Sequence, residues 1–437
     1  YLKYYYPVEF MAALMTSVID NPKKVSEYIL NCRNMNIAIL PPDVNAGEAG
    51  FSVTDGKIRY ALTAIKGVGR PVIDSLVQER KERGPFTNLK DFITRMSDKK
   101  EMQPRWKRAV STVDGALGEV VGQMYVEKYF PAAAKERMVK LVKNLQTALG
   151  ERIDAQEWMS DSTKIRAHEK LATFHVKVGY PDKWKDYSKL EIKNDSYWAN
   201  VCRASEWGFN DMYSRIGKPV DKDEWLMTPQ TVNAYYNPST NEICFPAAIL
   251  QPPFFNMEAD DAANYGAIGV VIGHEMTHGF DDQGRQFDKD GNLTDWWAPG
   301  DADRFKERAQ VMVDFFNKIE VLPGLQANGE LTLGENLADH GGLNVAYLAF
   351  QNATKDAPLG VVDGFTPEQR FFLAYATLWA GNIRDEQIRV YTKSDPHSLG
   401  KWRVNGALPH IQAWYDAFHI TPSDPLYVAP ENRVNVW

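Results

Sequence analysis

The sequence predicts a mainly α-helical protein with a small β-sheet, which is an α+β fold. Apolar residues recur at helical spacing over long segments, such as residues 103–149 and 162–178, with charged residues between them. Two shorter runs, residues 51–60 and 232–246, have strand-like halves around polar turn residues and are typical of β-hairpins. With 437 residues and a hydrophobic content of 44%, the chain is long enough for two or three domains with packed cores.

The composition argues against several classes of protein. No apolar run approaches the ~20 residues that span a bilayer, and the first residues are not typical of a signal peptide. Cys32, Cys202 and Cys244 are scattered, which indicates buried free thiols and not a disulfide framework or a cysteine-ligated zinc. The net charge is +4 over residues 1–100 and −11 over the remainder, so the two parts are expected to have different partners.

The first 100 residues read as short helices and one hairpin. Amphipathic helices are predicted over residues 7–19 and 23–35, and Pro41-Pro42 stops the second from continuing. The turn signal at residues 54–57 lies between two strand-like runs. A small helical N-terminal segment is therefore expected.

A glycine-rich turn follows at residues 64–71. Gly67 and Gly69 favour a tight hairpin, after which Pro71 can open a helix. Such a helix-hairpin-helix presents backbone N–H groups to a phosphate, and Lys66 and Arg70 would add charge to a weak, sequence-independent DNA contact through residues 64–83. An ordinary turn between two helices is the alternative, and the two glycines alone do not decide between them.

Four blocks of this segment, residues 5–14, 40–45, 64–69 and 84–87, together resemble one region of the alpha subunit of bacterial DNA polymerase III. The resemblance covers about residues 1–97 and has no counterpart to the metal-binding aspartates of the polymerase palm. It implies a DNA-contacting module and not a polymerase.

The strongest chemical motif is the H-E-x-x-H of His274, Glu275 and His278, inside a predicted helix over residues 262–280. Residues four apart on a helix share one face, so both imidazoles can bind one metal ion. Glu275 lies close enough to act as a general base on water.

A third ligand is expected from residues 334–339. A catalytic zinc takes three protein ligands and keeps one position open. Glu335, on a separate helix, completes a two-histidine, one-carboxylate set, and Asp339 lies one turn later, where it can accept the free N–H of a zinc histidine. The alternative is a solvated helix face. The sequence predicts one Zn²⁺ per chain.

Five blocks in order, residues 233–236, 245–255, 271–281, 334–339 and 401–406, resemble the neprilysin family of zinc metallopeptidases from about residue 104 to Trp437. The resemblance implies a zincin-like catalytic domain with remnants of a helical lobe. In it His274, His278 and Glu335 match the zinc ligands, Glu275 matches the general base, and Asp339 matches the partner of a zinc histidine.

The resemblance also implies a substrate site. His397 matches a histidine that stabilises the oxyanion, and Arg403 matches an arginine that holds a substrate carbonyl. The other matches are residues that grip the peptide backbone, Asn233 and Ala234, and an apolar pocket for the side chain after the scissile bond, Phe254, Val271 and Trp379. Without the family, His397 is typical of a surface histidine, Arg403 of a solvated or salt-bridged cation, and the apolar residues of a core.

Three segments are therefore expected: a polymerase-like segment over residues 1–100, a partial helical lobe over 101–225, and a zinc-peptidase domain over 226–437. Neprilysin relatives are about twice as long as the matching region. Our hypothesis is that the chain joins two unrelated partial genes, and that its helical layer exposes apolar surface which the rest of the lobe would cover.

The predicted function is hydrolysis of short peptides by a zinc-dependent endopeptidase that prefers a large apolar residue after the scissile bond. The alternative is a non-catalytic DNA-binding fragment of a replicative polymerase fused to an inactive peptidase half. The family acts outside the cytoplasm, whereas the chain has no recognisable signal peptide, so the sequence leaves the location open, along with the physiological peptide and the oligomeric state.

Overall fold

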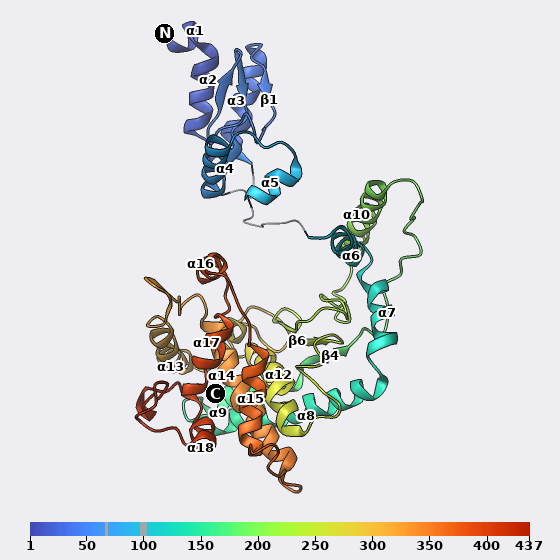
Figure 1. Cartoon of the computed structure of the whole chain (residues 1–437), viewed down its shortest axis with the longest axis vertical. Coiled ribbons are helices and arrows are strands. Elements are labelled where there is room, and N and C mark those ends of the chain that lie inside the picture. The colour runs from blue at the N-terminus through green and yellow to red at the C-terminus, as the bar shows by residue number, and fades with distance from the viewer. Residues whose placement is uncertain (66–68, 97–102) are drawn as a thin grey trace. The chain divides into compact units, whose positions relative to one another are not determined.

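The computed structural model of the chain describes residues 1–65, 69–96 and 103–437 (Figure 1). They divide into two compact units, Tyr1–Ser111 and Thr112–Trp437. Helix α6, Arg105–Ala116, contains the boundary.

The first unit contains helices and one small sheet. Its elements are α1 (Leu2–Tyr5), α2 (Pro7–Ser17), α3 (Pro22–Asn34), β1 (Ile39–Leu40), β2 (Ser52–Thr54), β3 (Lys57–Arg59), a 3₁₀ turn (Leu62–Ala64), α4 (Arg70–Arg83) and α5 (Leu89–Met96). Both early helices and the hairpin confirm the prediction. Asp55 and Gly56 have positive φ values of 50° and 67°, the conformation that a two-residue hairpin turn requires.

The glycine-rich turn is described only in part. Gly69 is the N-cap of α4, which begins at Arg70 and carries Pro71 in its first turn. Lys66 and Gly67 lie outside the described residues. The Arg70 guanidinium is exposed and lies 3.8 Å from the Asp74 carboxylate, so part of its charge is offset within the helix.

The second unit is mainly helical. After α6 its elements are α7 (Gly118–Tyr129), α8 (Ala132–Ala155), α9 (Asp161–Ala172), β4 (His175–Gly179), α10 (Tyr197–Tyr213), β5 (Tyr235–Asn237), β6 (Glu242–Pro246), α11 (Asp261–Asn264), a π-helical segment (Tyr265–Gly269), α12 (Val270–His278), α13 (Asp301–Phe316), β7 (Glu320–Leu322), β8 (Leu325–Gln326), α14 (Leu333–Thr354), α15 (Pro367–Leu378), α16 (Asp385–Ser394), α17 (Gly400–Asn405) and α18 (Gln412–Phe418). Further 3₁₀ turns lie at Gly284–Gln286, Leu408–His410 and Pro430–Asn432.

Two of the predicted helices need correction. Residues 103–149 do not form one helix: the chain breaks at Leu117 and again at Pro131, which is the N-cap of α8. A proline in a helix interior would remove a hydrogen bond and clash with the preceding turn. The second predicted helix ends at Ala172, and residues 175–179 form strand β4 instead.

A three-stranded sheet, in the order β4–β6–β5, lies beside the helices of the second unit. The central strand β6 is buried along its whole length. It pairs in parallel with β4 and antiparallel with β5. The β5–β6 pair confirms the predicted hairpin. The Lys177 ammonium lies 2.8 Å from the buried Glu242 carboxylate, which also accepts a 2.9 Å bond from the Tyr235 hydroxyl. These bonds hold the edge strand β5 to the rest of the sheet.

Helices α12 and α14 pack in direct backbone contact at the centre of the second unit. A Cβ atom added to Gly342 would lie 2.7 Å from the Val270 carbonyl oxygen, and one added to Gly273 would lie 2.9 Å from the Gly342 carbonyl oxygen. Only glycine permits so close an approach. The two helices that carry the H-E-x-x-H motif and Glu335 are thereby brought together.

Helix α10 exposes several large apolar side chains, among them Trp198, Phe209 and Met212. This is the exposed apolar surface that we expected of the helical layer. Within the described residues, no helix combines the length and the apolar character needed to cross a membrane.

Candidate metal centre and active-site cavity

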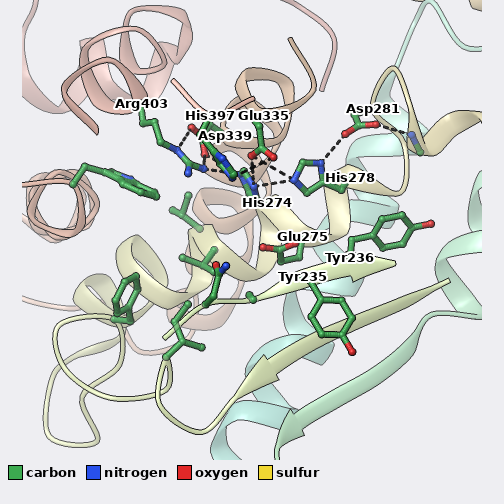
Figure 2. A pocket seen from close by; sticks show the side chains of 18 of the residues that line it. Tyr235, Tyr236, His274, Glu275, His278, Asp281, Glu335, Asp339, His397 and Arg403 are labelled. Carbon is green, nitrogen blue, oxygen red and sulfur yellow. Dashed lines mark hydrogen bonds and ion pairs between the residues drawn. The ribbon is translucent and has the colours of Figure 1, made fainter. Parts of the chain in front are cut away.

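Helix α12 places His274 and His278 one turn apart, and helix α14 brings Glu335 to them from its first turn (Figure 2). The two Nε2 atoms lie 3.0 Å apart. The Glu335 Oε2 atom lies 3.2 Å from Nε2 of His274 and 3.6 Å from Nε2 of His278. The three predicted ligand residues therefore converge on one point, and all their ligand atoms fall within 4.8 Å of one another.

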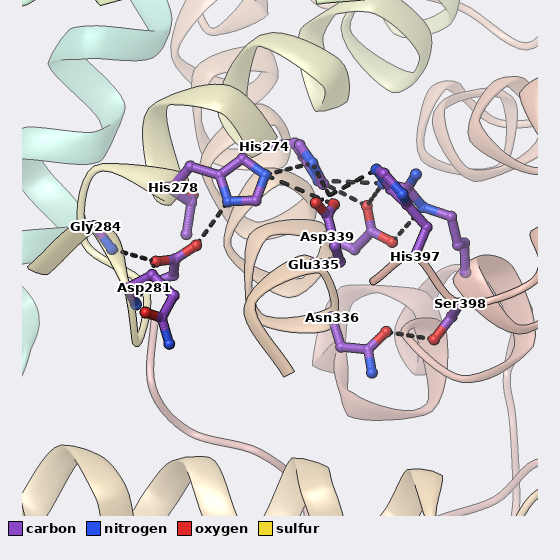
Figure 3. A network of polar contacts seen from close by, with 12 residues as sticks. His274, His278, Asp281, Gly284, Glu335, Asn336, Asp339, His397 and Ser398 are labelled. Carbon is purple, nitrogen blue, oxygen red and sulfur yellow. Dashed lines mark hydrogen bonds and ion pairs between the residues drawn. The ribbon is translucent and has the colours of Figure 1, made fainter. Parts of the chain in front are cut away.

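Each histidine is oriented by a carboxylate on its other ring nitrogen (Figure 3). His274 Nδ1 lies 2.8 Å from Asp339 Oδ1, and His278 Nδ1 lies 2.6 Å from Asp281 Oδ2. Carboxylates at these positions hold the N–H on Nδ1 and leave the Nε2 lone pair free for a metal. Asp339 was predicted. Asp281 was missed, although its position three residues after His278 was a usable signal.

The donor set fits a zinc ion. With N–H on both Nδ1 atoms, two Nε2 lone pairs and a carboxylate oxygen face one another at about 3 Å. Glu335 Oε2 is buried and accepts no hydrogen bond within the described part of the chain. Three acceptor atoms in such proximity repel one another unless a cation or a proton lies between them.

The pKa values of the two histidines agree with a positive charge between these three atoms. Burial lowers the pKa of His278, but the nearby carboxylates of Asp281 and Glu335 outweigh burial and hold the pKa well above 6.5. In His274 burial and the charge of His278 are likewise outweighed by Asp339 and Glu335, so its pKa is raised. A metal ion at this point would replace those protons.

Glu275 lies directly after His274 on α12. Its side chain is buried and lines a cavity that opens over the two histidines. Burial raises its pKa above the ordinary value, and the two neighbouring histidines partly oppose that shift. A carboxylate with a raised pKa is a stronger base than one in water, which suits the predicted role in proton transfer.

Arg403 supports the centre from α17. Its Nε donates to Asp339 Oδ2 at 2.7 Å and its Nη2 donates to Asp339 Oδ1 at 2.6 Å. The guanidinium also lies 3.9 Å from the ring centroid of Trp379. Burial raises the pKa of Asp339, but Arg403 and His274 outweigh burial and lower it. Arg403 is therefore a buried, salt-bridged cation at the edge of the site.

His397 lies at the site and not on a remote surface. Its Nε2 lies 3.3 Å from Glu335 Oε1 and its Nδ1 lies 2.8 Å from Asp395 Oδ1, while 48% of the side chain stays exposed. The next residue, Ser398, donates a 2.7 Å hydrogen bond to Asn336 on α14. The segment that carries His397 is thus tied to the helix that carries Glu335.

A cavity of about 490 Å³ opens over the centre. All twelve residues predicted for the peptidase site line it. They are Asn233, Ala234, Phe254, Val271, His274, Glu275, His278, Glu335, Asp339, Trp379, His397 and Arg403. Asp281, Gln283, Tyr236 and Tyr375 also line it and were not predicted. No single stretch of sequence reveals that these residues share one cavity.

The site and its sequence have counterparts in known proteins. Residues 83–181 and 233–434 match two profiles that are both described as Peptidase family M13. The chain belongs to peptidase family M13. Helices α12 and α14, which carry the three candidate ligands, both lie within the second match.

Relatives and solved structures agree with the M13 assignment. Neprilysin from Homo sapiens is 38% identical over 345 residues, which are 76% of this chain and 46% of neprilysin. Endothelin-converting enzyme 1 from Bos taurus is 37% identical over 350 residues, 78% of this chain and 46% of that enzyme. The inhibitor complex of the Mycobacterium tuberculosis zinc metalloprotease ZMP1 superposes with a TM-score of 0.75 at 39% identity, and the match covers 86% of this chain and 63% of that one.

The M13 chain therefore spans about half the length of the curated relatives that it matches. Residues 36–109 match a helix-hairpin-helix profile, which confirms the predicted motif. The resemblance of this segment to the DNA polymerase III alpha subunit stays a prediction, as does the division at residues 100 and 225.

Proposed function

We propose that the second unit is a zinc-dependent endopeptidase. The observation that supports this most strongly is the convergence of His274, His278 and Glu335 at the floor of a cavity that Glu275 also lines. Two histidines and one carboxylate form a known ligand set for a catalytic zinc. When bound, zinc polarises a carbonyl group and lowers the pKa of water.

The residues of the chain supply the proton transfers. Glu275 takes a proton from the attacking water and later returns it to the leaving amine. His397, half-exposed at the edge of the cavity, donates a hydrogen bond to the oxygen that becomes negative as water attacks. The Arg403 guanidinium, already fixed by Asp339, adds positive charge beside the substrate carbonyl.

The shape of the cavity favours an extended peptide. Asn233 and Ala234 come directly before the edge strand β5, where main-chain groups can pair with a substrate strand. Phe254, Val271 and Trp379 form an apolar wall, which favours a large apolar side chain after the scissile bond. Short peptides with such a residue are the proposed substrates.

Zinc content and cleavage of a short fluorogenic peptide test the proposal together. The full chain is expected to hold one zinc and to cleave the peptide. Glu335→Ala is expected to lose the zinc, whereas Glu275→Gln keeps the zinc and loses cleavage, because it removes the base and no ligand. Glu307→Gln, an exposed change on α13, is the matched control. A chain without zinc, or Glu275→Gln with full activity, would contradict the proposal.

A second function is favoured by the helix-hairpin-helix match. We propose that residues 64–83 make a weak, sequence-independent DNA contact. Binding to duplex DNA is expected to weaken as salt rises, and to weaken further when Lys66 and Arg70 are both changed to alanine. Duplex binding that the double variant leaves unchanged would refute this contact.

A further inference from the structure

Lys170 is a buried charged residue that neither the motif nor the proposed mechanism uses. It lies near the end of α9, and its side chain is only 1% exposed. Its ammonium donates three hydrogen bonds to main-chain carbonyl oxygens, at 2.7 Å to Gly279, 2.8 Å to Gly284 and 2.7 Å to Phe287. An ammonium group has three N–H donors, so all of them are used.

Three aromatic rings also lie near this ammonium. The rings of Tyr236, Phe280 and Trp296 have their centroids 5.6 to 5.8 Å from the nitrogen. Burial lowers the pKa of Lys170 to about 7, and the charges of Asp281 and Asp288 oppose that shift. A buried charge is retained only where hydrogen bonds compensate its loss of water. Here all three hydrogen bonds go to one loop.

That loop is the segment 279–287, which begins directly after His278 (Figure 3). Asp281 accepts hydrogen bonds at Oδ1 from the backbone N–H groups of Gln283, at 2.9 Å, and Gly284, at 2.7 Å. Its other oxygen lies 2.6 Å from His278 Nδ1. The conformation of the loop therefore determines where the Asp281 carboxylate meets the imidazole.

The loop also presses against the end of helix α12. A Cβ atom at Gly284 would lie 1.7 Å from the His278 carbonyl oxygen, so the two backbones are in direct contact. Lys170 bonds to the loop at its first residue, at Gly284 and at its last residue. One side chain thus ties three points of the loop together.

We propose that Lys170 is a positioning residue for the metal centre: it fixes the loop that carries Asp281, and Asp281 in turn fixes the imidazole of His278. The inference rests on the proposed zinc site. It assigns a role in metal affinity to a residue on α9 whose three hydrogen bonds all go to main-chain carbonyl groups of the loop.

The zinc dissociation constant of the full chain, measured by competition with a chromogenic chelator, tests this role without any activity assay. Lys170→Met keeps the length of the side chain and removes its three donors. The dissociation constant is expected to rise about 10- to 100-fold, the usual effect of losing a group that orients a metal ligand.

A double variant separates positioning from general stability. If Lys170 acts through Asp281, Lys170→Met added to Asp281→Ala is expected to weaken zinc binding little further. Lys177→Met is the matched control, because Lys177 is also buried and also donates to a main-chain carbonyl, but its partners are Glu224 and Glu242. It is expected to lower the stability of the fold and to leave zinc affinity unchanged.

Three results would overturn the positioning role: unchanged affinity in Lys170→Met, additive losses in the double variant, or an equal loss in Lys177→Met. If Lys170→Met fails to fold, Lys170→Gln carries the same test, and wild-type affinity in it would overturn the role. A wild-type chain that binds no zinc would refute the proposed function and this inference together. Zinc bound by the wild type with unchanged variants would refute the inference alone.

Discussion

The contact between helices α12 and α14 predicts that Gly342→Ala damages the metal centre although it changes no ligand residue. The added methyl carbon would lie 2.7 Å from the Val270 carbonyl oxygen and 2.8 Å from the His274 backbone nitrogen. Both are backbone atoms of α12, so no side chain can rotate away. The helices themselves have to separate.

The size of the shift follows from ordinary contact distances. Ordinary van der Waals contacts of a Cβ atom begin at 3.4 Å. The two helices would therefore have to move apart by about 0.7 Å to accommodate the added carbon. The same shift would stretch the 2.8 Å bond between His274 and Asp339 to about 3.5 Å, beyond hydrogen-bond range. Metal ligand distances tolerate only about 0.2 Å. We expect zinc affinity to fall at least about tenfold, and the free energy of unfolding to fall by about 1–3 kcal/mol.

Chelator competition and urea denaturation measure the two effects. Gly208→Ala on α10 is the matched control, since an added Cβ at that position meets no atom of the described chain within 4 Å. It is expected to leave zinc affinity unchanged and to stabilise the fold by about 0.4–1 kcal/mol. Wild-type zinc affinity in a folded Gly342→Ala would refute the argument that helix contact sets the ligand geometry.

Three further predictions concern pH, a hydrogen bond and metal removal. Burial lowers the pKa of His410 to about 4, whereas unfolded histidine titrates near 6.5, so the unfolded chain binds more protons between these values. The contribution of His410 to the free energy of unfolding should therefore fall by roughly 2 kcal/mol between pH 7 and pH 5. In urea denaturation, the free energy of unfolding of His410→Gln should depend less steeply on pH than that of the wild type. Ser398→Ala removes the hydrogen bond to Asn336, which is worth about 1 kcal/mol. Because this bond holds the segment that carries His397, kcat/KM should fall several-fold while zinc affinity stays unchanged. Removing zinc present at about 1,000 times its dissociation constant should cost about 4 kcal/mol of unfolding free energy, measured by denaturation with and without chelator, and Glu335→Ala should show no such difference.

The pairing of residues on each of the two helices could be predicted from sequence because it depends on local geometry. The spacing of His274 and His278 fixes their common face on any helix, and the same is true of Glu335 and Asp339. One supporting contact depends on distant parts of the chain and has no local pattern. Lys170 bonds to carbonyl oxygens more than 100 residues away, and a lysine in an amphipathic helix ordinarily indicates a solvated face.

The errors in secondary structure have a similar cause. Residues 175–179 are too short a run to distinguish strand from helix, and their pairing with β6 decides the outcome. The π-helical segment at Tyr265–Gly269 was also missed. A Cβ atom at Gly266 would lie 2.0 Å from the Phe371 carbonyl oxygen, so this part of the helix is packed against α15. Neither partner is visible from the local sequence.

The three acids around the two histidines differ in their hydrogen bonds, and this difference can be seen without reference to any family. Asp339 is bonded at both oxygens by Arg403, and Asp281 by His278 and two backbone N–H groups, so both carboxylates are satisfied by the protein. Glu335 Oε2 accepts no hydrogen bond from the described residues and faces two imidazole nitrogens. Because an unsatisfied buried carboxylate oxygen is costly, a positive charge between Glu335 Oε2 and the two imidazole nitrogens would stabilise the site. The two satisfied acids orient the histidines, and the unsatisfied Oε2 atom of Glu335 lies where a metal ion would fit.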